Sequence, residues 1–107
     1  MDLTKKKCVP CEGGMPPMEK SKVNELLKEV PTWDLKDGHL CKRFELKNFV
    51  EAMKFLNKVA KIAEHEGHHP DFSVHYRKVD FEIWTHAVNG LSENDFILAA
   101  KIDKLQK

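Results

Sequence analysis

The sequence predicts an α+β fold, in which a single domain holds a four-stranded antiparallel sheet of two hairpins with three helices packed on one face. Two segments predict hairpins: the first contains a strong turn signal at Asp37 and Gly38, and the second alternates between apolar and polar residues. Three other segments have apolar residues at helical spacing. Because helices and hairpins alternate along the chain and each has one apolar face, one layered domain can bury all of them.

The first predicted elements are a short helix and a tight hairpin. Apolar side chains at i, i+3, i+4 and i+7 over residues 23–30 indicate an amphipathic helix that Pro31 stops. Residues 33–35 and 39–44 then flank Asp37 and Gly38. This pair is typical of the type I′ turn, whose two central residues need positive φ angles.

A long helix comes next. Asn48 can cap it, and residues 49–63 form a broad apolar stripe of the kind that faces a core. Gly67 and Pro70 should end it, because glycine is favoured at the position directly after a helix and proline cannot continue a helix.

The last part of the chain predicts a second hairpin and a final helix. Residues 72–76 and 79–83 alternate between apolar and polar, and the chain should turn near residues 77–78. Ser92, with Asp95 three residues later, is a capping-box signature for the start of the final helix.

Length, charge and cysteine content restrict the class of protein. A chain of 107 residues, 41% hydrophobic and 33% charged, suits one globular domain, here residues 18–107 behind an N-terminal arm of residues 1–17. The 18 basic residues against 17 acidic ones give no excess for nucleic acid, and no apolar stretch has membrane-spanning length. Three cysteines, an odd number, fit a reducing compartment, so we expect a cytoplasmic protein.

Histidines carry the candidate chemistry. His68 and His69 follow the long helix and His86 follows the second hairpin, so only the fold could bring them together. Imidazole exchanges protons near neutral pH, which makes the three a candidate metal-free acid–base site. The alternative is that they are helix caps or surface residues, like the remaining three histidines.

A catalytic zinc site is one alternative. Residues 65–69 match the H-E-x-x-H pattern of zinc proteases, which needs an unbroken helix that presents both histidines. Gly67 lies within the pattern and Pro70 follows it at once, so we expect the helix to end too early.

A structural metal is the other alternative. Cys8 and Cys11 form a C-x-x-C pair, which His39 and Cys41 could complete. A single C-x-x-C pair is a weak signal, and a pair of reduced cysteines in the arm is the favoured explanation. We therefore expect neither a metal nor a cofactor.

The residues around the histidines resemble the signature of the pterin-4a-carbinolamine dehydratases. The matching residues are Glu64, His68, His69, Pro70, Tyr76, Thr85, His86, Gly90, Leu91, Ser92 and Asp95. The resemblance extends to Trp33 and to the Phe44-x4-Phe49 lead into the long helix. It implies a small α+β domain with helices on one side of the sheet, assembled into dimers or tetramers.

The reaction that the resemblance implies is dehydration of 4a-hydroxytetrahydropterin to the quinonoid dihydropterin, in tetrahydrobiopterin recycling after aromatic amino acid hydroxylation. Expulsion of the 4a hydroxide needs a proton donor, and formation of the C4a–N5 double bond needs loss of the N5 proton. Two imidazoles in different protonation states can do both. The expected catalytic residues are His68, His69 and His86, and the expected substrate-binding residues are Glu64, Pro70, Thr85, Ala87, Val88, Asp95 and Trp33.

An alternative is a non-catalytic partner protein that retains the fold. Animal members of the family also act as dimerisation cofactors of a homeodomain transcription factor. The arm with Cys8 and Cys11 resembles microbial members instead, and retention of the three histidines with Glu64 and Thr85 favours the enzyme. The expected partners are a pterin and further copies of the chain, with no direct contact to nucleic acid or membrane.

Overall fold

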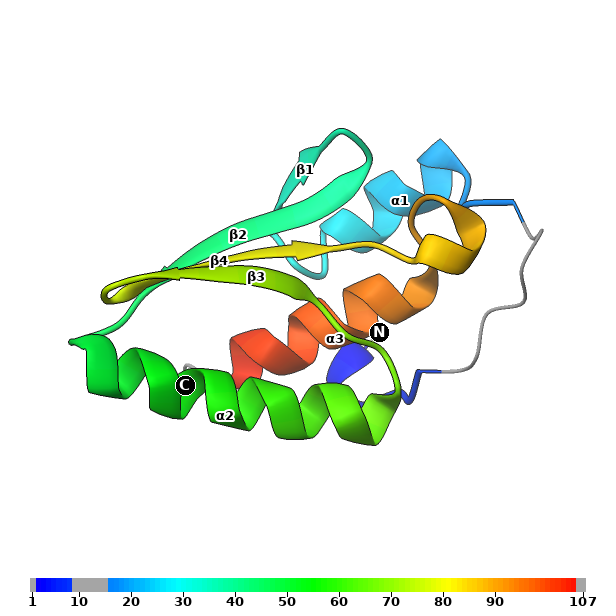
Figure 1. Cartoon of the computed structure of the whole chain (residues 1–107). Coiled ribbons are helices and arrows are strands. Elements are labelled where there is room, and N and C mark those ends of the chain that lie inside the picture. The colour runs from blue at the N-terminus through cyan, green and yellow to red at the C-terminus, as the bar shows by residue number, and fades with distance from the viewer. Residues whose placement is uncertain (1, 9–15, 106–107) are drawn as a thin grey trace.

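The computed structural model describes residues 2–8 and 16–105, and it confirms the predicted α+β class (Figure 1). Its elements in chain order are the 3₁₀ turn η1 (Leu3–Lys5), α1 (Lys20–Leu27), β1 (Asp34–Lys36), β2 (His39–Glu45), α2 (Phe49–Glu66), β3 (Asp71–His75), β4 (Lys78–Ile83), the 3₁₀ turn η2 (His86–Val88) and α3 (Glu93–Lys104). The order helix, hairpin, helix, hairpin, helix is the predicted one.

The four strands form one antiparallel sheet in the order β1-β2-β4-β3. The second strand of each hairpin lies in the centre, where Leu40 pairs with Ile83 and Phe44 pairs with Val79. The first strands, β1 and β3, are therefore the two edges. The expectation that both hairpins share one sheet is confirmed.

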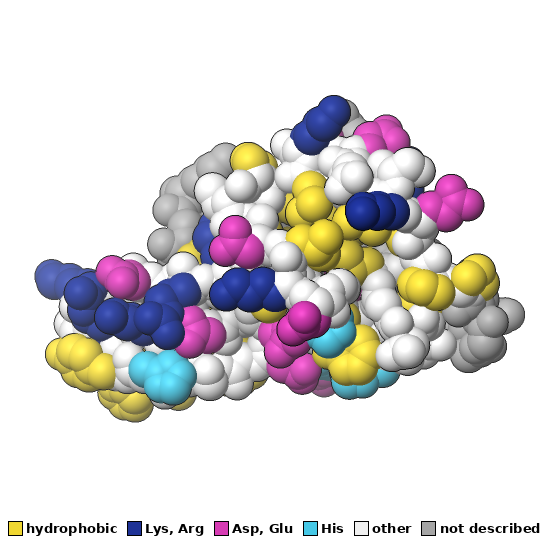
Figure 2. Space-filling model, turned by 90° about the horizontal axis from the view of Figure 1, so that it is seen from above, with side chains coloured by type: hydrophobic (Ala, Val, Ile, Leu, Met, Phe, Trp, Pro, Cys, Tyr) yellow, Lys and Arg dark blue, Asp and Glu magenta, His cyan; other side chains and the backbone are white. Residues whose placement is uncertain are grey.

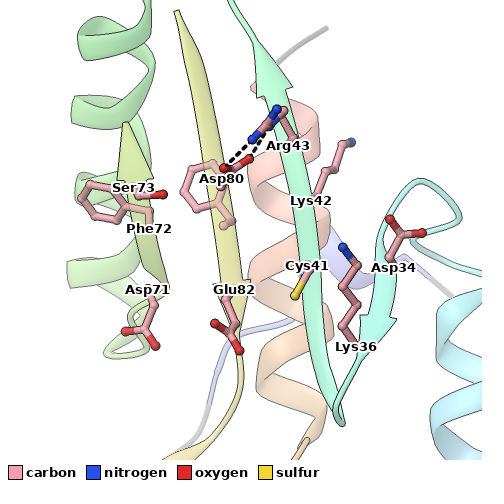
Figure 3. A pocket seen from close by; sticks show the side chains of 11 residues that line it. Asp34, Lys36, Cys41, Lys42, Arg43, Asp71, Phe72, Ser73, Asp80 and Glu82 are labelled. Carbon is pink, nitrogen blue, oxygen red and sulfur yellow. Dashed lines mark hydrogen bonds and ion pairs between the residues drawn. The ribbon is translucent and has the colours of Figure 1, made fainter. Parts of the chain in front are cut away.

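Helices bury the apolar face of the sheet. The apolar inward side chains of β2 and β4 are each 5% exposed or less: Leu40, Phe44, Val79, Phe81 and Ile83. α2 and α3 lie beneath this face, and α1 lies beside the β1 edge (Figures 1 and 3). Burial of each such side chain contributes about 1.5–3 kcal/mol, so the sheet and the helices stabilise one another.

Both hairpins turn through two residues. Asp37 (φ 51°) and Gly38 (φ 77°) have the positive φ angles predicted for the first turn. β3 ends at residue 75 and β4 begins at residue 78, so Tyr76 and Arg77 form the second turn. The expected turn at residues 77–78 is wrong by one residue, because Tyr76 takes a left-handed conformation (φ 58°) that is uncommon for a non-glycine residue.

The first helix is shifted towards the N-terminus of its predicted range. α1 begins at Lys20 and ends at Leu27, four residues before Pro31. The following residues make looser turns, in which the N–H of Val30 bonds to Leu27 O at 3.1 Å. This loosening agrees with the steric effect of proline on the residue before it.

α2 begins and ends where the sequence predicts. The side chain of Asn48 accepts a hydrogen bond from the backbone N–H of Glu51 at 2.9 Å. At the other end Gly67 has a φ of 67° and its N–H bonds to Ala63 O. The N–H of His68 also bonds to Ala63 O, at 3.2 Å, which sets the direction in which the chain leaves the helix.

Part of the predicted arm packs on the domain. Leu3 and Cys8 are buried, and η1 lies against α3. Lys6 Nζ pairs with a carboxylate oxygen of Glu93 at 3.0 Å. Residues 2–8 therefore belong to the packed structure, whereas Cys11 and the rest of residues 9–15 lie outside the described residues.

The second face of the sheet carries charged side chains of both signs (Figures 2 and 3). Arg43 donates to both carboxylate oxygens of Asp80, at 2.6 and 2.9 Å. A broad hollow of about 560 Å³ lies over this face. Among the residues that the structure describes, no helix is both long enough and apolar enough to cross a membrane.

We expect Gly67→Ala to lower the free energy of unfolding by about 1–2 kcal/mol, the cost of a left-handed conformation for an L-residue. Beyond the two adjoining residues, no atom lies within 4 Å of the added Cβ, so the cost should come from the backbone alone. Chemical denaturation measures it. Gly67→Asn is the matched control and should cost less, because asparagine tolerates this conformation; equal losses in both variants would contradict the explanation.

Candidate active site

The three predicted catalytic histidines line one hollow of about 360 Å³. His68 and His69 lie in the segment between α2 and β3, and His86 opens η2 after β4. Pro70, Thr85 and Ala87 of the predicted binding residues also line the hollow. The fold thus brings together segments that are well separated in the sequence.

A buried carboxylate holds His68. The Nε2 atom of His68 lies 2.6 Å from Oδ1 of Asp95, and Asp95 is fully buried. The other oxygen of Asp95 accepts hydrogen bonds from Thr85 Oγ1 at 2.8 Å and from the N–H of Ser92 at 2.9 Å. The bond to Ser92 belongs to the predicted capping box of α3, which the structure confirms. Asp95 is therefore both a helix cap and the partner of His68.

Because a carboxylate only accepts hydrogen bonds, the contact with Asp95 implies a proton on Nε2 of His68. A neutral His68 ring would then have its free lone pair on Nδ1. The orientation and the tautomer of an imidazole are commonly set in this way by a neighbouring carboxylate. His68 is nearly buried, with 12% of its side chain exposed, so little water competes for this contact.

His69 has a different and more exposed partner. Its Nε2 atom lies 2.5 Å from Oε2 of Glu64, whose side chain extends from the last turns of α2. The exposed fractions of the two side chains are 59% and 78%. An exposed pair of this kind is screened by water and contributes little to stability. Glu64, one of the expected substrate-binding residues, therefore lies beside His69.

His86 contacts an aromatic ring. Its imidazole centroid lies 3.8 Å from the ring centroid of Trp84, with an angle of 34° between the planes. Trp84 itself lines the hollow, as do Asp71 and Asn94. None of these three is among the residues that the sequence predicts for the site. Their positions directly beside Pro70, Thr85 and Asp95 in the sequence are the signal that could have found them.

Four of the predicted binding residues are not in the lining of the hollow. Glu64 and Asp95 contact histidines that line it, whereas Trp33 and Val88 do not. Trp33 is buried in the core, where its Nε1–H donates to the carboxylate of Asp103 at 3.1 Å. Val88 is buried in η2. The sequence contains two tryptophans, and of these it is Trp84, not Trp33, that the fold brings to the histidines.

The fold does not bring together the residues of either metal-binding pattern. α2 ends at Glu66, so His69 leaves the helix that carries His65. His65 lines a different groove, between α2 and α3. Cys8 is buried near Glu66, whereas Cys41 lies on the open face of the sheet (Figure 3). Within residues 2–8 and 16–105 the structure contains no group of three or more potential ligands placed to hold a metal ion.

A second buried carboxylate belongs to Glu66, two residues before His68. Glu66 accepts a hydrogen bond from the N–H of Cys8 at 2.8 Å and from Lys101 Nζ at 2.7 Å. Burial raises the pKa of Glu66, but these bonds and the charge of Lys101 outweigh it and lower the pKa below its ordinary value. The thiol of Cys8 donates to Asn94 O at 3.6 Å. The N-terminal segment, α2 and α3 therefore meet directly beside the hollow.

Fold and site together define a class of protein: a small α+β domain in which three histidines line one hollow. Two of these histidines, His68 and His69, contact a carboxylate. Comparison with known proteins agrees with this class. The family profile of pterin 4 alpha carbinolamine dehydratase matches residues 16–105. The chain belongs to the pterin-4-alpha-carbinolamine dehydratase family, which is a family of hydro-lyases.

Individual relatives support the same membership. A provisionally named pterin-4-alpha-carbinolamine dehydratase of Rickettsia canadensis is 52% identical over 103 residues, 94% of each chain. One from Halorhodospira halophila is 47% identical over 107 residues, 98% of each chain. A crystal structure from Brucella melitensis, described as a transcriptional coactivator/pterin dehydratase, has a TM-score of 0.81 and 30% identity, and the match covers 85% of this chain and 99% of that one.

We expect Cys8 to resist alkylation in the folded protein. Burial and the neighbouring Glu66 carboxylate raise the pKa of the Cys8 thiol to about 12 from 9.0, and only the thiolate reacts. Each pKa unit lowers the thiolate fraction about tenfold at neutral pH, so labelling by iodoacetamide should slow by roughly 10³-fold relative to unfolded protein. Peptide mass mapping measures the rate. Fast labelling of Cys8 under native conditions would show that residues 2–8 do not pack as described.

Proposed function

We propose that the protein dehydrates 4a-hydroxytetrahydropterin (pterin-4a-carbinolamine) to the quinonoid dihydropterin, with histidines as general acid and base. The observation that carries the proposal is the single hollow that His68, His69 and His86 line. Membership of the pterin-4-alpha-carbinolamine dehydratase family supports the substrate class.

The proposed chemistry requires two proton transfers. One group protonates the hydroxyl that leaves C4a, and another accepts the proton of N5 as the C4a–N5 double bond forms. His69 and His86 are exposed at the hollow, so both can exchange protons with solvent between turnovers. We assign the two transfers to this pair, because general acid–base catalysis needs groups that change protonation state near neutral pH.

The remaining site residues bind and orient the substrate in this proposal. His68 is held by the buried Asp95, so its ring presents a fixed polar atom to a pterin. Pro70, Thr85 and Ala87 line the same hollow and supply small or backbone contacts. Glu64 acts on His69 through their contact at 2.5 Å. We propose that no metal or cofactor takes part.

We expect His86→Ala and His69→Ala each to lower kcat by about 10²–10⁴-fold, the usual contribution of a general acid or base. A coupled aromatic amino acid hydroxylase assay, which follows loss of the 4a-hydroxypterin absorbance, measures the rate. His75→Ala is the matched control, because His75 is exposed on β3 and lies near Asp80 instead. Turnover should survive dialysis against a chelator.

Two results would contradict this proposal. Near-parent rates in both single variants would show that the histidines are structural. A zinc ion retained at one equivalent per chain, with activity lost on its removal, would show that the site is a metal site and not a metal-free acid–base site. If the two histidines share one transition state, the double variant should lose less than the product of the single effects.

We place the reaction in pterin recycling within a reducing compartment, the cytoplasm. Cys8 and Cys41, the cysteines that the structure describes, are both free thiols, which supports this placement. A non-catalytic role is the second candidate, because the Brucella melitensis structure is described as a coactivator as well as a dehydratase. A folded protein without any turnover in the hydroxylase assay would favour that role.

We propose further that the protein is a homodimer or homotetramer. Phe49, Val50 and Met53 at the start of α2 are 48%, 60% and 39% exposed, and Phe72 on the edge strand β3 is 55% exposed. Edge strands and clustered apolar side chains are commonly covered by a partner. A second copy of the chain would cover both.

Light scattering coupled to size exclusion should therefore give a mass well above the 12.4 kDa of one chain. Val50→Glu should weaken the assembly by placing a charge among apolar side chains, whereas Lys58→Glu, at an exposed position more than one turn beyond Met53, should not. A parent protein that runs only as a monomer at micromolar concentration would contradict the proposal.

A further inference from the structure

Two imidazole rings contact the indole of Trp84. His39 stacks on it, with ring centroids 4.4 Å apart and an angle of 12° between the planes. The ring centroid of His86 lies 3.8 Å from that of the indole, with an angle of 34° between the planes. His39, which the sequence predicts to be a surface residue, is thus joined through one indole to His86 of the hollow.

The sheet register sets this arrangement. Leu40 pairs with Ile83 across β2 and β4, so the residues next to them, His39 and Trp84, meet at the same end of the two strands. Glu82 lies two residues before Trp84 and hence on the same face of β4. Its Oε2 lies 2.5 Å from Nδ1 of His39, which fixes the outer imidazole.

The edge of the indole is held as well. Nε1 of Trp84 donates to Oδ2 of Asp71, at the start of β3, at 3.4 Å. Asp71 pairs with Glu82 in the sheet, and Figure 3 shows their side chains at the same end of the open face. Three strands therefore fix the indole, through His39 from β2, Asp71 from β3 and its own chain after β4.

We propose that Trp84 is a positioning residue for His86, and that His39, held by Glu82, supports the indole. This role rests on the proposed function, in which His86 transfers a proton. His86 is exposed in a three-residue turn, so the ring of Trp84 is a rigid surface against which its imidazole can be held. Because the two imidazoles already contact the indole, Trp84 acts on the reaction through His86.

The kinetic test compares Trp84→Leu with Trp84→Phe. The leucine variant should lower kcat about tenfold with little change in KM, because a misplaced catalytic group slows the chemical step. The phenylalanine variant, which keeps a ring, should stay within about threefold of the parent. Tyr76→Leu is the matched control, since Tyr76 is an exposed aromatic side chain at the tip of the β3–β4 hairpin.

A double variant separates positioning from general packing. In a His86→Ala background Trp84→Leu should cost less than about twofold further, because its effect is transmitted through His86. A full tenfold loss in that background would overturn the proposal. So would parent-like kcat in Trp84→Leu.

A spectroscopic measurement tests the contact without turnover. In the unliganded parent, the carbon-bound protons of His86 should show nuclear Overhauser contacts to the indole and an upfield ring-current shift that Trp84→Leu removes and His39→Ala reduces. Absence of these contacts in the parent overturns the proposal even if the leucine variant fails to fold. A parent protein with the contacts but with no dehydratase activity would instead overturn the proposed function, and this role with it.

Discussion

The buried carboxylate of Asp95 joins the parts of the molecule on which the site depends. It caps α3 through Ser92, accepts a hydrogen bond from Thr85 after β4, and holds His68 after α2. A carboxylate that is fully buried is costly unless all of its acceptor positions are used. The three segments must therefore meet in one geometry, and this requirement places the histidines of separate segments around a single hollow.

The surroundings of the histidines differ in rigidity. His68 is nearly buried and is held by the hydrogen bonds around Asp95, whereas His69 and its partner Glu64 are mostly exposed. His86 lies on the indole of Trp84, which the paired strands hold. Such a division suits an acid–base site, because orientation demands fixed groups and proton exchange demands contact with water. The neighbouring residues His68 and His69 thus differ: the first is fixed in orientation and the second is in contact with water.

The N-terminal segment has a larger part in the structure than a tail would have. Cys8 donates its N–H to Glu66, the last residue of α2, and Lys101 of α3 neutralises the same carboxylate. This second buried network lies on the opposite side of Gly67 from His68. The residues on both sides of Gly67 therefore contact α3: Glu66 binds Lys101, and His68 binds Asp95. The unusually high pKa of the Cys8 thiol follows from this packing.

The sequence by itself determined the element types, the Asp37-Gly38 turn, the caps at Asn48 and Ser92 and the end of α2 at Gly67, because each depends on neighbours within a few residues. It also identified the histidines as a group. Only the tertiary structure decided that Asp95 is the partner of His68, that Trp84 and not Trp33 reaches the hollow, and that Cys8 is buried. These contacts join residues far apart in the chain, so they depend on strand register and helix packing, which local preferences do not specify.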